Sequence, residues 1–367
     1  MRILIINPIL YTAETDKIPK VKSIKDTMIY TLCLGFLKMG AEPVLIAASD
    51  YKPETEESYP FEVVWMDTAW KKVCKPRCLP YMPALSSYIR KYREEIDGMV
   101  SSEVFSLCSL TAAMRAPEKT VVWHELAAHN RMLHYIPSKV WYGVAAKLFF
   151  KKVTVTARSE KAREFIKTYC PQVSDTVIDH GVDIDKIKEK EKKSNHFIVA
   201  SQLIPRKRID KIIDVFAKFL EQNEETKSYT LDIAGSGELE QVLKIQAEAL
   251  GISDNVIFHG HLTHEQLAPL IADAKAMLVY TKQDNNMVSI AESIAAGTPV
   301  ITTTVPFNAE YITKEKLGIA DDNWGIDELN SICDGNEEYV KNCIKYREKL
   351  SAEYCAGQFI QEFQQMH

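Results

Sequence analysis

Short apolar runs rich in β-branched residues alternate with helical patterns along this chain of 367 residues. The run RILIINP at residues 2–8 precedes a helical pattern at 26–40, and the run EPVLIAA follows at 42–48. Gly40 stands where a glycine commonly ends a helix. Buried strands that alternate with helices predict a parallel sheet covered on both faces. The same alternation continues with FEVVWMD, KTVVWHE and KKVTVTA, and Ser159 is a suitable N-cap for the helix at 159–169.

A charged segment, DIDKIKEKEKKSN at 183–195, reads as an exposed connection, and the alternation then starts again. The length also favours more than one core. We therefore predict two doubly wound α/β domains, at 1–180 and 195–345, whose ligands bind beyond the carboxyl ends of the strands. A last helix at 346–367 is expected to cross back and pack on the first domain.

The composition excludes several classes of protein. The 45 basic and 50 acidic residues give a net charge of −5, so nothing indicates a nucleic-acid partner. The apolar start is too short and β-branched for a signal peptide, and no uncharged apolar run is long enough to span a membrane. The eight cysteines are scattered, which fits a reducing cytoplasm. Cys74 and Cys78 lack the further ligands of a zinc set.

Two stretches of the second half follow predicted strands and carry groups suited to phosphate. ASQLIPRKRID places Arg206, Lys207 and Arg208 before a helix, and DIAGSGELEQ places Gly235 and Gly237 at a strand-to-helix turn. Cations near a helix start bind phosphate, and glycine lets the backbone approach a ligand. A solvated basic turn and an ordinary tight turn explain the same residues.

The stretch KQDNNMVSIAESIAAGTPVI at 282–301 holds two carboxylates, Asp284 and Glu292, eight residues apart. Ser289 and Glu292 also fit the S-x-x-E capping box, which would make Glu292 a structural residue. Ligand binding and capping both remain open from these residues alone.

Histidines stand at the ends of two further strands. His124 follows a buried run in VVWHELAAHN, where a polar side chain is well placed for a cleft. The spacing H-E-x-x-x-H does not match the zinc motif H-E-x-x-H. In VIFHGHL, we expect the backbone around Gly260 to be better placed for a ligand than His259.

Taken together, these stretches resemble the retaining glycosyltransferases of glycosyltransferase family 4, which have the GT-B fold of two Rossmann-like domains facing a central cleft. VIDHGVDIDK resembles the family's N-G-V-D segment, and SQLIPRKRIDKIIDVF resembles its R-L-x-x-x-K-G-x-D segment. DIAGSGELE, VIFHGHLTHEQL and DNNMVSIAESIAAGTPVI match further landmarks in order. The resemblance is strong from about residue 153 to 319 and weaker before it.

The resemblance implies roles for single residues. Asp284 and Glu292 occupy the ends of the family's E-x7-E motif, facing the donor sugar and the nucleotide ribose. Lys207 would contact the diphosphate, and His124 would lie near the transferred sugar. The other implied donor contacts are Gln202, Arg206, Arg208, Gly235, His261, Leu262 and the backbone of Asn286, Met287 and Val288.

Three positions depart from the family pattern. Asp284 is one methylene shorter than the usual glutamate. Gln202 stands where an arginine is usual, so one cation is missing unless Arg206 or Arg208 supplies it. The glycine-rich turn after the first strand is replaced by a segment whose lysines could meet an anionic acceptor or simply be solvated. These lysines are Lys17, Lys20, Lys22 and Lys25.

The resemblance implies transfer of a hexosyl unit from a nucleotide diphosphate sugar, with UDP favoured, to a hydroxyl of a glycan or lipid-linked acceptor. Such a role is typical of bacterial surface polysaccharide synthesis, and it implies no cofactor and no obligate metal. The alternatives are a catalytically silent nucleotide-sugar-binding protein and a GT-B epimerase. A basic and aromatic loop at 70–83 could bring a cytoplasmic protein to the inner face of the membrane, or be an ordinary solvated loop.

Overall fold

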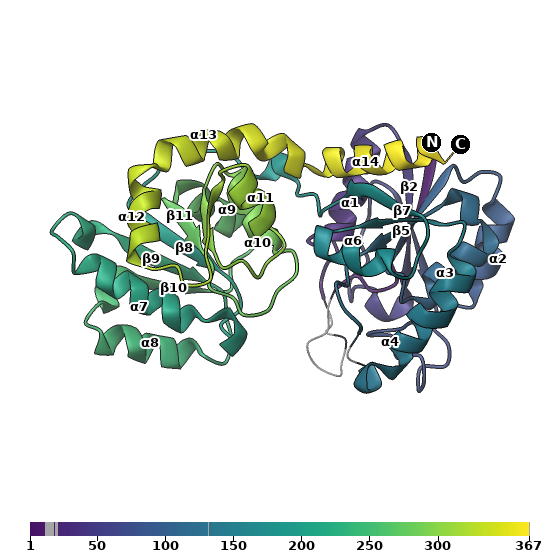
Figure 1. Cartoon of the computed structure of the whole chain (residues 1–367), viewed down its shortest axis with the longest axis horizontal. Helices are drawn as coiled ribbons and strands as arrows, with labels where there is room; N and C mark the ends of the chain where they lie inside the picture. The colour runs from purple at the N-terminus through teal and green to yellow at the C-terminus, as the bar shows by residue number, and fades with distance from the viewer. Residues whose placement is uncertain (12–17, 19–20, 131, 367) are drawn as a thin grey trace. The chain divides into compact units, whose positions relative to one another are not determined.

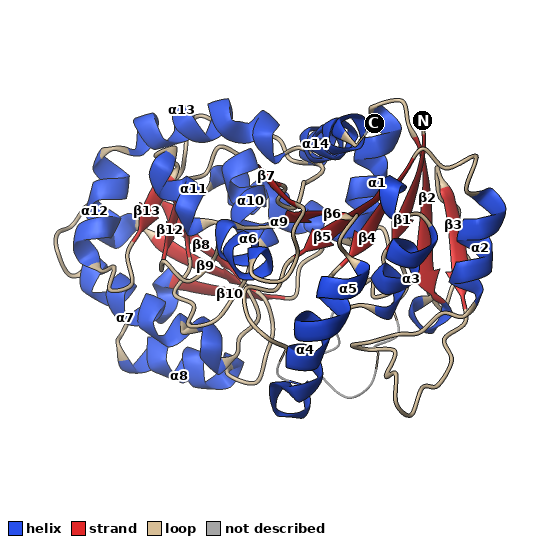
Figure 2. Cartoon of the chain, turned by 45° about the vertical axis from the view of Figure 1, so that its right-hand side comes forward, coloured by secondary structure: helices blue, strands red, loops and turns tan. Residues whose placement is uncertain are grey.

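The chain folds into two units, seen in a computed structural model that describes residues 1–11, 18, 21–130 and 132–366. The first unit combines Met1–Gly181 with Ala352–His367, and the second is Val182–Ser351. Each unit has its own parallel sheet with helices around it (Figures 1 and 2). The two sheets therefore have separate cores, and each is described by itself.

The first unit holds a seven-stranded sheet in the order β3-β2-β1-β4-β5-β6-β7. The strands are β1 (Arg2–Ile6), β2 (Glu42–Ala48), β3 (Glu62–Met66), β4 (Gly98–Ser102), β5 (Thr120–His124), β6 (Thr154–Ala157) and β7 (Val173–Val177). The helices are α1 (Met28–Lys38), α2 (Ala84–Tyr92), α3 (Leu107–Arg115), α4 (Ile136–Val140), α5 (Lys147–Phe149), α6 (Glu160–Lys167) and α14 (Ala352–Gln365). A π-helical turn, Trp141–Ala146, joins α4 to α5. The order reverses between β1 and β4.

The second unit repeats this plan with six strands in the order β10-β9-β8-β11-β12-β13. The strands are β8 (His196–Ala200), β9 (Thr230–Ala234), β10 (Val256–Gly260), β11 (Ala276–Leu278), β12 (Val300–Thr302) and β13 (Gly318–Ala320). The helices are α7 (Ile209–Leu220), α8 (Glu240–Ala249), α9 (His264–Asp273), α10 (Val288–Ala295), α11 (Ala309–Lys314), α12 (Ile326–Asp334) and α13 (Asn336–Tyr346). Here the order reverses between β8 and β11.

Both sheets confirm the predicted doubly wound α/β architecture. The strands expected from apolar runs all form. The inner strands are buried on both faces, and Ile3–Ile6 of β1, for example, is at most 1% exposed, while the edge strands β3 and β10 are partly exposed. Gly40 adopts a left-handed φ of +78° after α1, and the Ser159 hydroxyl caps α6 by accepting from the Ala162 amide. The sequence analysis did not identify β4, β7 and β13, whose segments are short or only partly apolar.

The last helical stretch is broken into α13, a 3₁₀ turn at Arg347–Leu350, and α14. Helix α14 packs beside α1 in the first unit, where Phe359 lies against Trp123 with ring centroids 5.3 Å apart. The helix that joins the first unit thus begins at Ala352, whereas the sequence analysis placed its start at 346.

The charged segment at 183–195 is mostly exposed, as the sequence predicted, and it follows the boundary between the two units. It is nevertheless part of the second unit, where Ile184 and Ile187 are buried in the core. The Arg347 guanidinium donates to the carbonyls of both residues. The burial of these two apolar side chains attaches the charged segment to the second unit.

All eight cysteines are free thiols. Among the described residues, none of the helices is both long and apolar enough to cross a bilayer.

Candidate functional site

The main candidate site forms where the strand order of the second sheet reverses. Strands β8 and β11 are neighbours, with Phe197 opposite Ala276, although β9 and β10 separate them in the sequence. The loops that follow them therefore leave the same edge of the sheet side by side. Ligands of doubly wound sheets bind at such a switch point. The first loop carries Arg206 and Lys207, and the second carries Asp284.

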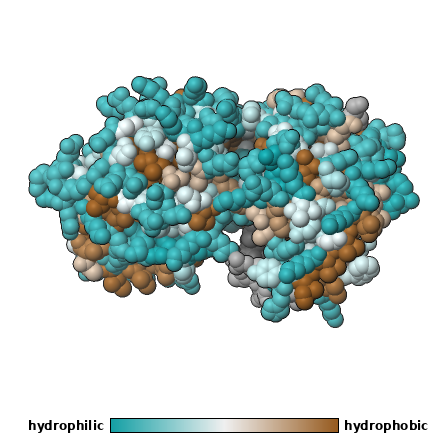
Figure 3. Space-filling view, viewed as in Figure 1, coloured by the Kyte–Doolittle hydropathy of each residue, from teal (hydrophilic) through white to brown (hydrophobic). Residues whose placement is uncertain are grey.

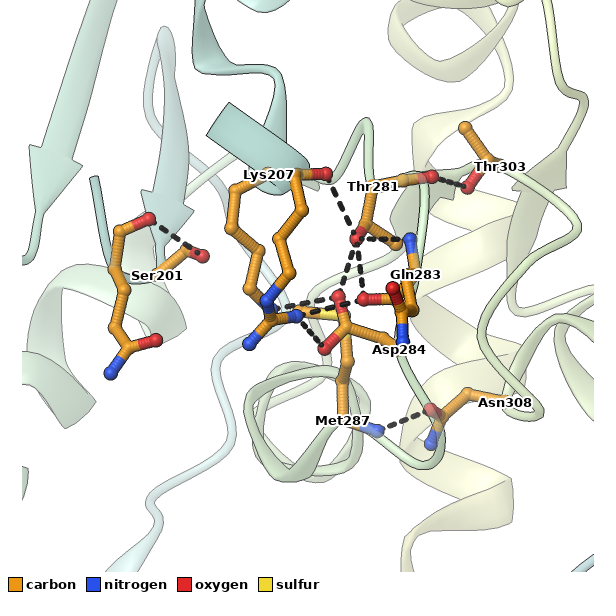
Figure 4. Close-up of polar contacts among 10 residues, drawn as sticks. Ser201, Lys207, Thr281, Gln283, Asp284, Met287, Thr303 and Asn308 are labelled. Atoms are coloured by element: carbon orange, nitrogen blue, oxygen red, sulfur yellow. Dashed lines mark hydrogen bonds and ion pairs between the residues drawn. The ribbon is translucent and has the colours of Figure 1, made fainter. Parts of the chain in front are cut away.

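Two cations of the first loop meet one carboxylate of the second (Figure 4). Lys207 Nζ lies 2.8 Å from Asp284 Oδ2, and the Arg206 guanidinium lies 2.7 Å from Asp284 Oδ1. The Thr281 hydroxyl donates to the same carboxylate. Arg206 also donates to the Gln283 carbonyl at 2.8 Å. The cluster carries two positive charges and one negative charge, so it retains an excess cation for an anionic ligand.

Burial differs between the two cations. The Lys207 side chain is 10% exposed and that of Asp284 is 13% exposed, while Arg206 is 38% exposed. Buried charges are tolerated when they are paired and hydrogen-bonded, which Asp284 provides for Lys207. Arg206 lies at the solvent side of the same carboxylate. An incoming anion would therefore meet Arg206 with little desolvation.

Arg208 is directed to a different partner. It adopts a left-handed φ of +48° directly before α7, and its guanidinium makes two contacts of 3.1 Å with the Asp210 carboxylate. The hydrogen bond that Arg208 donates to Asp210 raises the pKa of Arg208 above its usual value. Of the three cations predicted to bind phosphate, two lie on Asp284 and the third belongs to an ion pair at the start of α7.

Close packing of the backbone requires glycine at the two positions after β9. A Cβ on Gly235 would lie 1.8 Å from the Ser201 carbonyl oxygen, and one on Gly237 would lie 2.3 Å from that of Leu203. The Gly235 amide also donates to the Gly260 carbonyl at 2.8 Å. These glycines seat the β9 loop directly against the loop after β8, which carries the exposed Gln202. They shape the site whether or not they touch a ligand.

Glu292 does not cap a helix, so the capping-box explanation is wrong. Helix α10 begins at Val288 with Met287 as its N-cap and no side-chain cap bond, which makes Glu292 its fifth residue. The Glu292 carboxylate, 15% exposed, lies 3.0 Å from His264 Nδ1 at the start of α9. This ion pair brings the chain after β10 to α10.

The start of α10 is held by a residue that the sequence analysis missed. The side-chain oxygen of Asn308, which is 1% exposed, accepts from the Met287 amide at 2.7 Å, and its amide nitrogen donates to Tyr311. One of the three predicted amide donors is therefore engaged within the protein. Asn286 and Val288 are half-buried. The first N–H groups of a helix lack acceptors inside it, so Val288 keeps the geometry of an anion-binding donor.

His261 and Leu262 follow β10, an edge strand that β9 separates from β8. His261 is exposed and Leu262 is half-buried. The preceding His259 instead bonds to Asp232 at 2.5 Å. Gly260 has a left-handed φ of +67°, which turns the chain toward α9.

His124 lies in the first unit, as the last residue of β5. Its side chain is fully buried, with Nδ1 3.0 Å from a Glu103 carboxylate oxygen. The ring stacks on Phe165 with centroids 6.1 Å apart. Its Nε2 atom is buried and has no hydrogen-bond partner among the described residues.

Three polar residues around His124 were not predicted from the sequence. Glu103 directly follows β4, Arg158 follows β6 and His180 follows β7. All three carry the same signal as His124, a polar side chain at or just after a strand end. Glu103 and His180 were missed because β4 and β7 were not recognised, whereas Arg158 follows a predicted strand and this signal could have found it. Burial would raise the pKa of Glu103, but the His124 ring and the Glu125 amide lower it below its ordinary value. Burial and the charge of Arg158 lower the pKa of His180.

Arg158 is buried at 8% exposure in the centre of this group. It donates to Glu125 at 2.8 Å, contacts His180 Nε2 at 3.2 Å, and lies over the Trp123 ring at 3.8 Å. The carboxyl edge of the first sheet thus holds a compact group of paired charges, in which some buried polar atoms keep no hydrogen-bond partner among the described residues.

Two further expectations concern lysines and metal. Lys17 and Lys20 lie outside the described residues, while Lys22 and Lys25 are exposed. Over the part of the chain that the structure describes, no three histidine, cysteine, aspartate or glutamate residues are grouped as metal ligands.

Comparisons with known proteins agree with the fold. Residues 182–347 match the family model described as glycosyl transferases group 1. The α-monoglucosyldiacylglycerol synthase of Streptococcus pneumoniae is 27% identical over 249 residues, which are 61% of this chain and 55% of that protein. The match thus spans about half of the relative's length.

Two solved structures share the fold over nearly the whole chain. Anabaena HepE, solved in complex with UDP, has a TM-score of 0.66 at 15% identity and covers 100% of both chains. WaaG, a glycosyltransferase involved in lipopolysaccharide biosynthesis, has a TM-score of 0.63 at 14% identity, over 98% of this chain and 99% of that one. At these identities the likeness establishes the GT-B fold alone. The family match covers the second unit, and the GT-B likeness extends over nearly the whole chain, so both comparisons are consistent with a group 1 glycosyltransferase.

Proposed function

We propose that this protein transfers a hexosyl unit, with retention, from a nucleotide diphosphate sugar to a hydroxyl of a glycan or lipid-linked acceptor. The observation that carries the proposal is the convergence of Arg206 and Lys207 on Asp284 at the switch point of the second sheet. A departing diphosphate needs fixed positive charge, and preorganised cations supply it without reorganisation during the reaction.

Asp284 holds both cations in position until the donor binds. The diphosphate would then take over Lys207 and Arg206, and Asp284 would turn one oxygen to the sugar hydroxyls. Arg206 supplies the cation that Gln202 cannot, because it already lies on the same carboxylate as Lys207. Arg208 contributes less, since Asp210 occupies it.

The nucleotide would lie along the start of α10. Glu292 accepts hydrogen bonds from the ribose hydroxyls, because a carboxylate is a strong acceptor. His264 holds the Glu292 side chain in position for this contact. The amides of Asn286 and Val288 face the phosphates, whereas Met287 is left to Asn308. Gly235, His261 and Leu262 line the base and ribose end.

The reaction breaks the bond between the anomeric carbon and the diphosphate oxygen, and it forms a bond from that carbon to the acceptor oxygen. The acceptor proton passes to the leaving phosphate on the same face of the sugar. His124 would bind the transferred sugar through its Nε2. This role is supported by the lack of a partner for that buried atom, since buried polar atoms normally have one.

UDP is the favoured nucleotide because HepE was solved with UDP and with UDP-glucose. WaaG acts in lipopolysaccharide biosynthesis and the S. pneumoniae relative is named for a glycolipid, which supports a glycan or lipid-linked acceptor in bacterial surface glycan synthesis. The free thiols support a cytoplasmic location, where cysteines stay reduced.

A thermal-shift panel of UDP-, GDP-, ADP- and CDP-sugars tests donor binding, because a bound ligand raises the melting temperature. We expect a shift with a UDP-sugar, and we expect Glu292→Ala to weaken binding by roughly tenfold for one lost charge-assisted hydrogen bond. Turnover is then followed as nucleotide release over an acceptor panel, with and without a chelator, and is expected to persist with it.

Three results would redirect the proposal. The absence of binding to any nucleotide sugar would refute it. Tight binding without turnover would favour a silent nucleotide-sugar-binding protein. A new sugar nucleotide formed without an acceptor would favour an epimerase.

A further inference from the structure

The helical segment 136–149 in the first unit presents a stripe of apolar side chains to solvent. Ile136, Val140, Val144 and Leu148 are 65%, 59%, 55% and 58% exposed. Figure 3 shows a brown area in the region where Figure 1 labels α4. Scattered exposed apolar residues are ordinary, but a continuous row indicates a surface that contacts something.

The stripe stays straight because of the π-helical turn. Residues spaced by four overshoot a turn of an α-helix, which has 3.6 residues, so a row of this spacing normally winds around the helix. The turn Trp141–Ala146 has the wider i→i+5 bonding of a π-helix, which holds more residues per turn. It offsets the drift, and four successive positions remain on one side.

The opposite face of the segment is firmly anchored. Tyr142, Ala146 and Phe150 are completely buried in one core cluster, and the Trp141 indole donates to the Val104 carbonyl at 2.8 Å. The exposed stripe is therefore held out by a packed helix. Its exposure does not come from loose packing at a chain end.

The charged side chains of the segment itself all have one sign. The lysines of this region are all exposed: Lys139, Lys147, Lys151 and Lys152. The sequence has no acidic residue between Glu125 and Glu160. Lys139 and Lys147 each lie three residues after a member of the stripe, so they flank it on the helix surface. Apolar residues flanked by lysines are complementary to a surface that is apolar beneath and anionic at its boundary.

One other exposed apolar region lacks this combination. On α8, Val242 and Ile245 are 59% and 63% exposed, but the exposed Glu238 and Glu248 accompany them. The loop at 70–83 also exposes apolar side chains, Trp70 and Val73, beside lysines, but Trp70 stacks on Tyr81 and Lys71 is paired with Asp50 at 2.7 Å. The membrane contact that the sequence placed on this loop remains a prediction, and the continuous row of side chains favours the helical segment.

We propose that the segment 136–149 docks on an anionic lipid surface. The stripe enters the boundary between headgroups and acyl chains, and the lysines contact lipid phosphates. The helix would lie parallel to the surface, as amphipathic interfacial helices do. Docking would be reversible, because four half-exposed side chains are far from a membrane-spanning anchor.

The test is co-sedimentation of the full chain with vesicles of phosphatidylcholine that contain about one third phosphatidylglycerol, compared with pure phosphatidylcholine. We expect binding to the anionic vesicles at low salt and much weaker binding at high salt. The pair Val140→Ser with Leu148→Ser should weaken binding by at least about tenfold, because half-exposed apolar area no longer enters the bilayer. Lys139→Gln with Lys147→Gln should weaken it by a similar factor on anionic vesicles only.

The matched control is Val242→Ser with Ile245→Ser on α8, which removes comparable exposed area and should leave vesicle binding unchanged. Melting temperatures of all variants verify that folding is retained. The readout does not depend on sugar transfer, so failure of the proposed function would not affect it.

The inference is overturned if the wild type does not bind anionic vesicles at low salt, or if the α8 variant loses as much binding as the α4–α5 variant. It is also overturned if analytical ultracentrifugation finds a dimer that Val140→Ser with Leu148→Ser dissociates, since the stripe would then be covered by a second copy of the chain.

Discussion

Two carboxylates, Glu103 and Asp284, follow strands of the two sheets and both meet basic side chains, but in different surroundings. Glu103 lies against the fully buried His124, and the adjacent Arg158 is covered by Trp123. Asp284 lies between the nearly buried Lys207 and the more exposed Arg206. The first group satisfies most of its charges internally. The second has more cations than acids and opens to solvent.

The comparison indicates that charged residues at the strand ends of a doubly wound sheet can serve either structure or ligand binding. In the first unit, charge fixes the shape of a strand edge around His124. In the second unit, charge is held ready for a ligand. Substitutions in the first group should therefore affect stability most, and substitutions in the second should affect turnover most.

The largest stability effect is expected for Arg158→Ala. It should lower the free energy of unfolding by about 3 kcal/mol, because it leaves Glu125 without its buried partner and removes the cation from Trp123. Arg206→Ala is the matched variant in the second unit and should cost less than about 1 kcal/mol, since that ion pair is substantially exposed. Urea unfolding of both variants measures the difference, and equal losses would contradict the comparison.

The largest catalytic effect is expected for Lys207→Ala. Loss of one fixed cation at the leaving diphosphate should lower kcat by roughly 10²-fold, by analogy with the removal of an oxyanion donor. Arg208→Ala is the control, because Asp210 already engages Arg208 and turnover should change little. Steady-state kinetics of both variants, measured with the donor identified by thermal shift, test this difference. Unchanged kcat for Lys207→Ala would show that Lys207 does not act on the leaving diphosphate.

The smallest effect concerns pH. The folded protein holds the pKa of Glu103 below its ordinary value of 4.5, so its carboxylate contributes stability that is fully present above that pH. This contribution is lost as the pH falls from 4.5 through the lowered pKa. The stability advantage of the wild type over Glu103→Gln should therefore shrink on acidification below 4.5. Urea unfolding across this range tests it, and a constant advantage would show that Glu103 does not titrate in this way.

Much of the second unit could be predicted from the sequence. Its strands are continuous apolar runs, and the residues after them fall at one sheet edge in any doubly wound topology, so Lys207 and Asp284 could be expected near one another. The helix start at Val288 could not, because S-x-x-E matches a capping box regardless of where the backbone turns. The actual start is fixed by Asn308, which is distant in sequence.

The first unit was less predictable. The segment of β4, GMVSS, has a glycine and two serines, and its identity as a strand depends on pairing with β1 and β5 on either side. Because β4 was not recognised as a strand, the sequence did not predict that Glu103 lies beside His124. The burial of Ile184 and Ile187 was missed for the same reason, since it depends on contacts with the distant Arg347.

The sequence by itself determined the α/β class, the two sheets and most of the strand ends that carry polar residues, because hydrophobic periodicity and turn residues are local properties. The tertiary structure decided which charges pair: Arg206 and Lys207 with Asp284, Arg208 with Asp210, and Glu292 with His264. Among three adjacent cations, only the directions of their side chains and the approach of a distant loop determine which can meet a ligand. Those depend on contacts between residues far apart in the chain, and no local pattern encodes them.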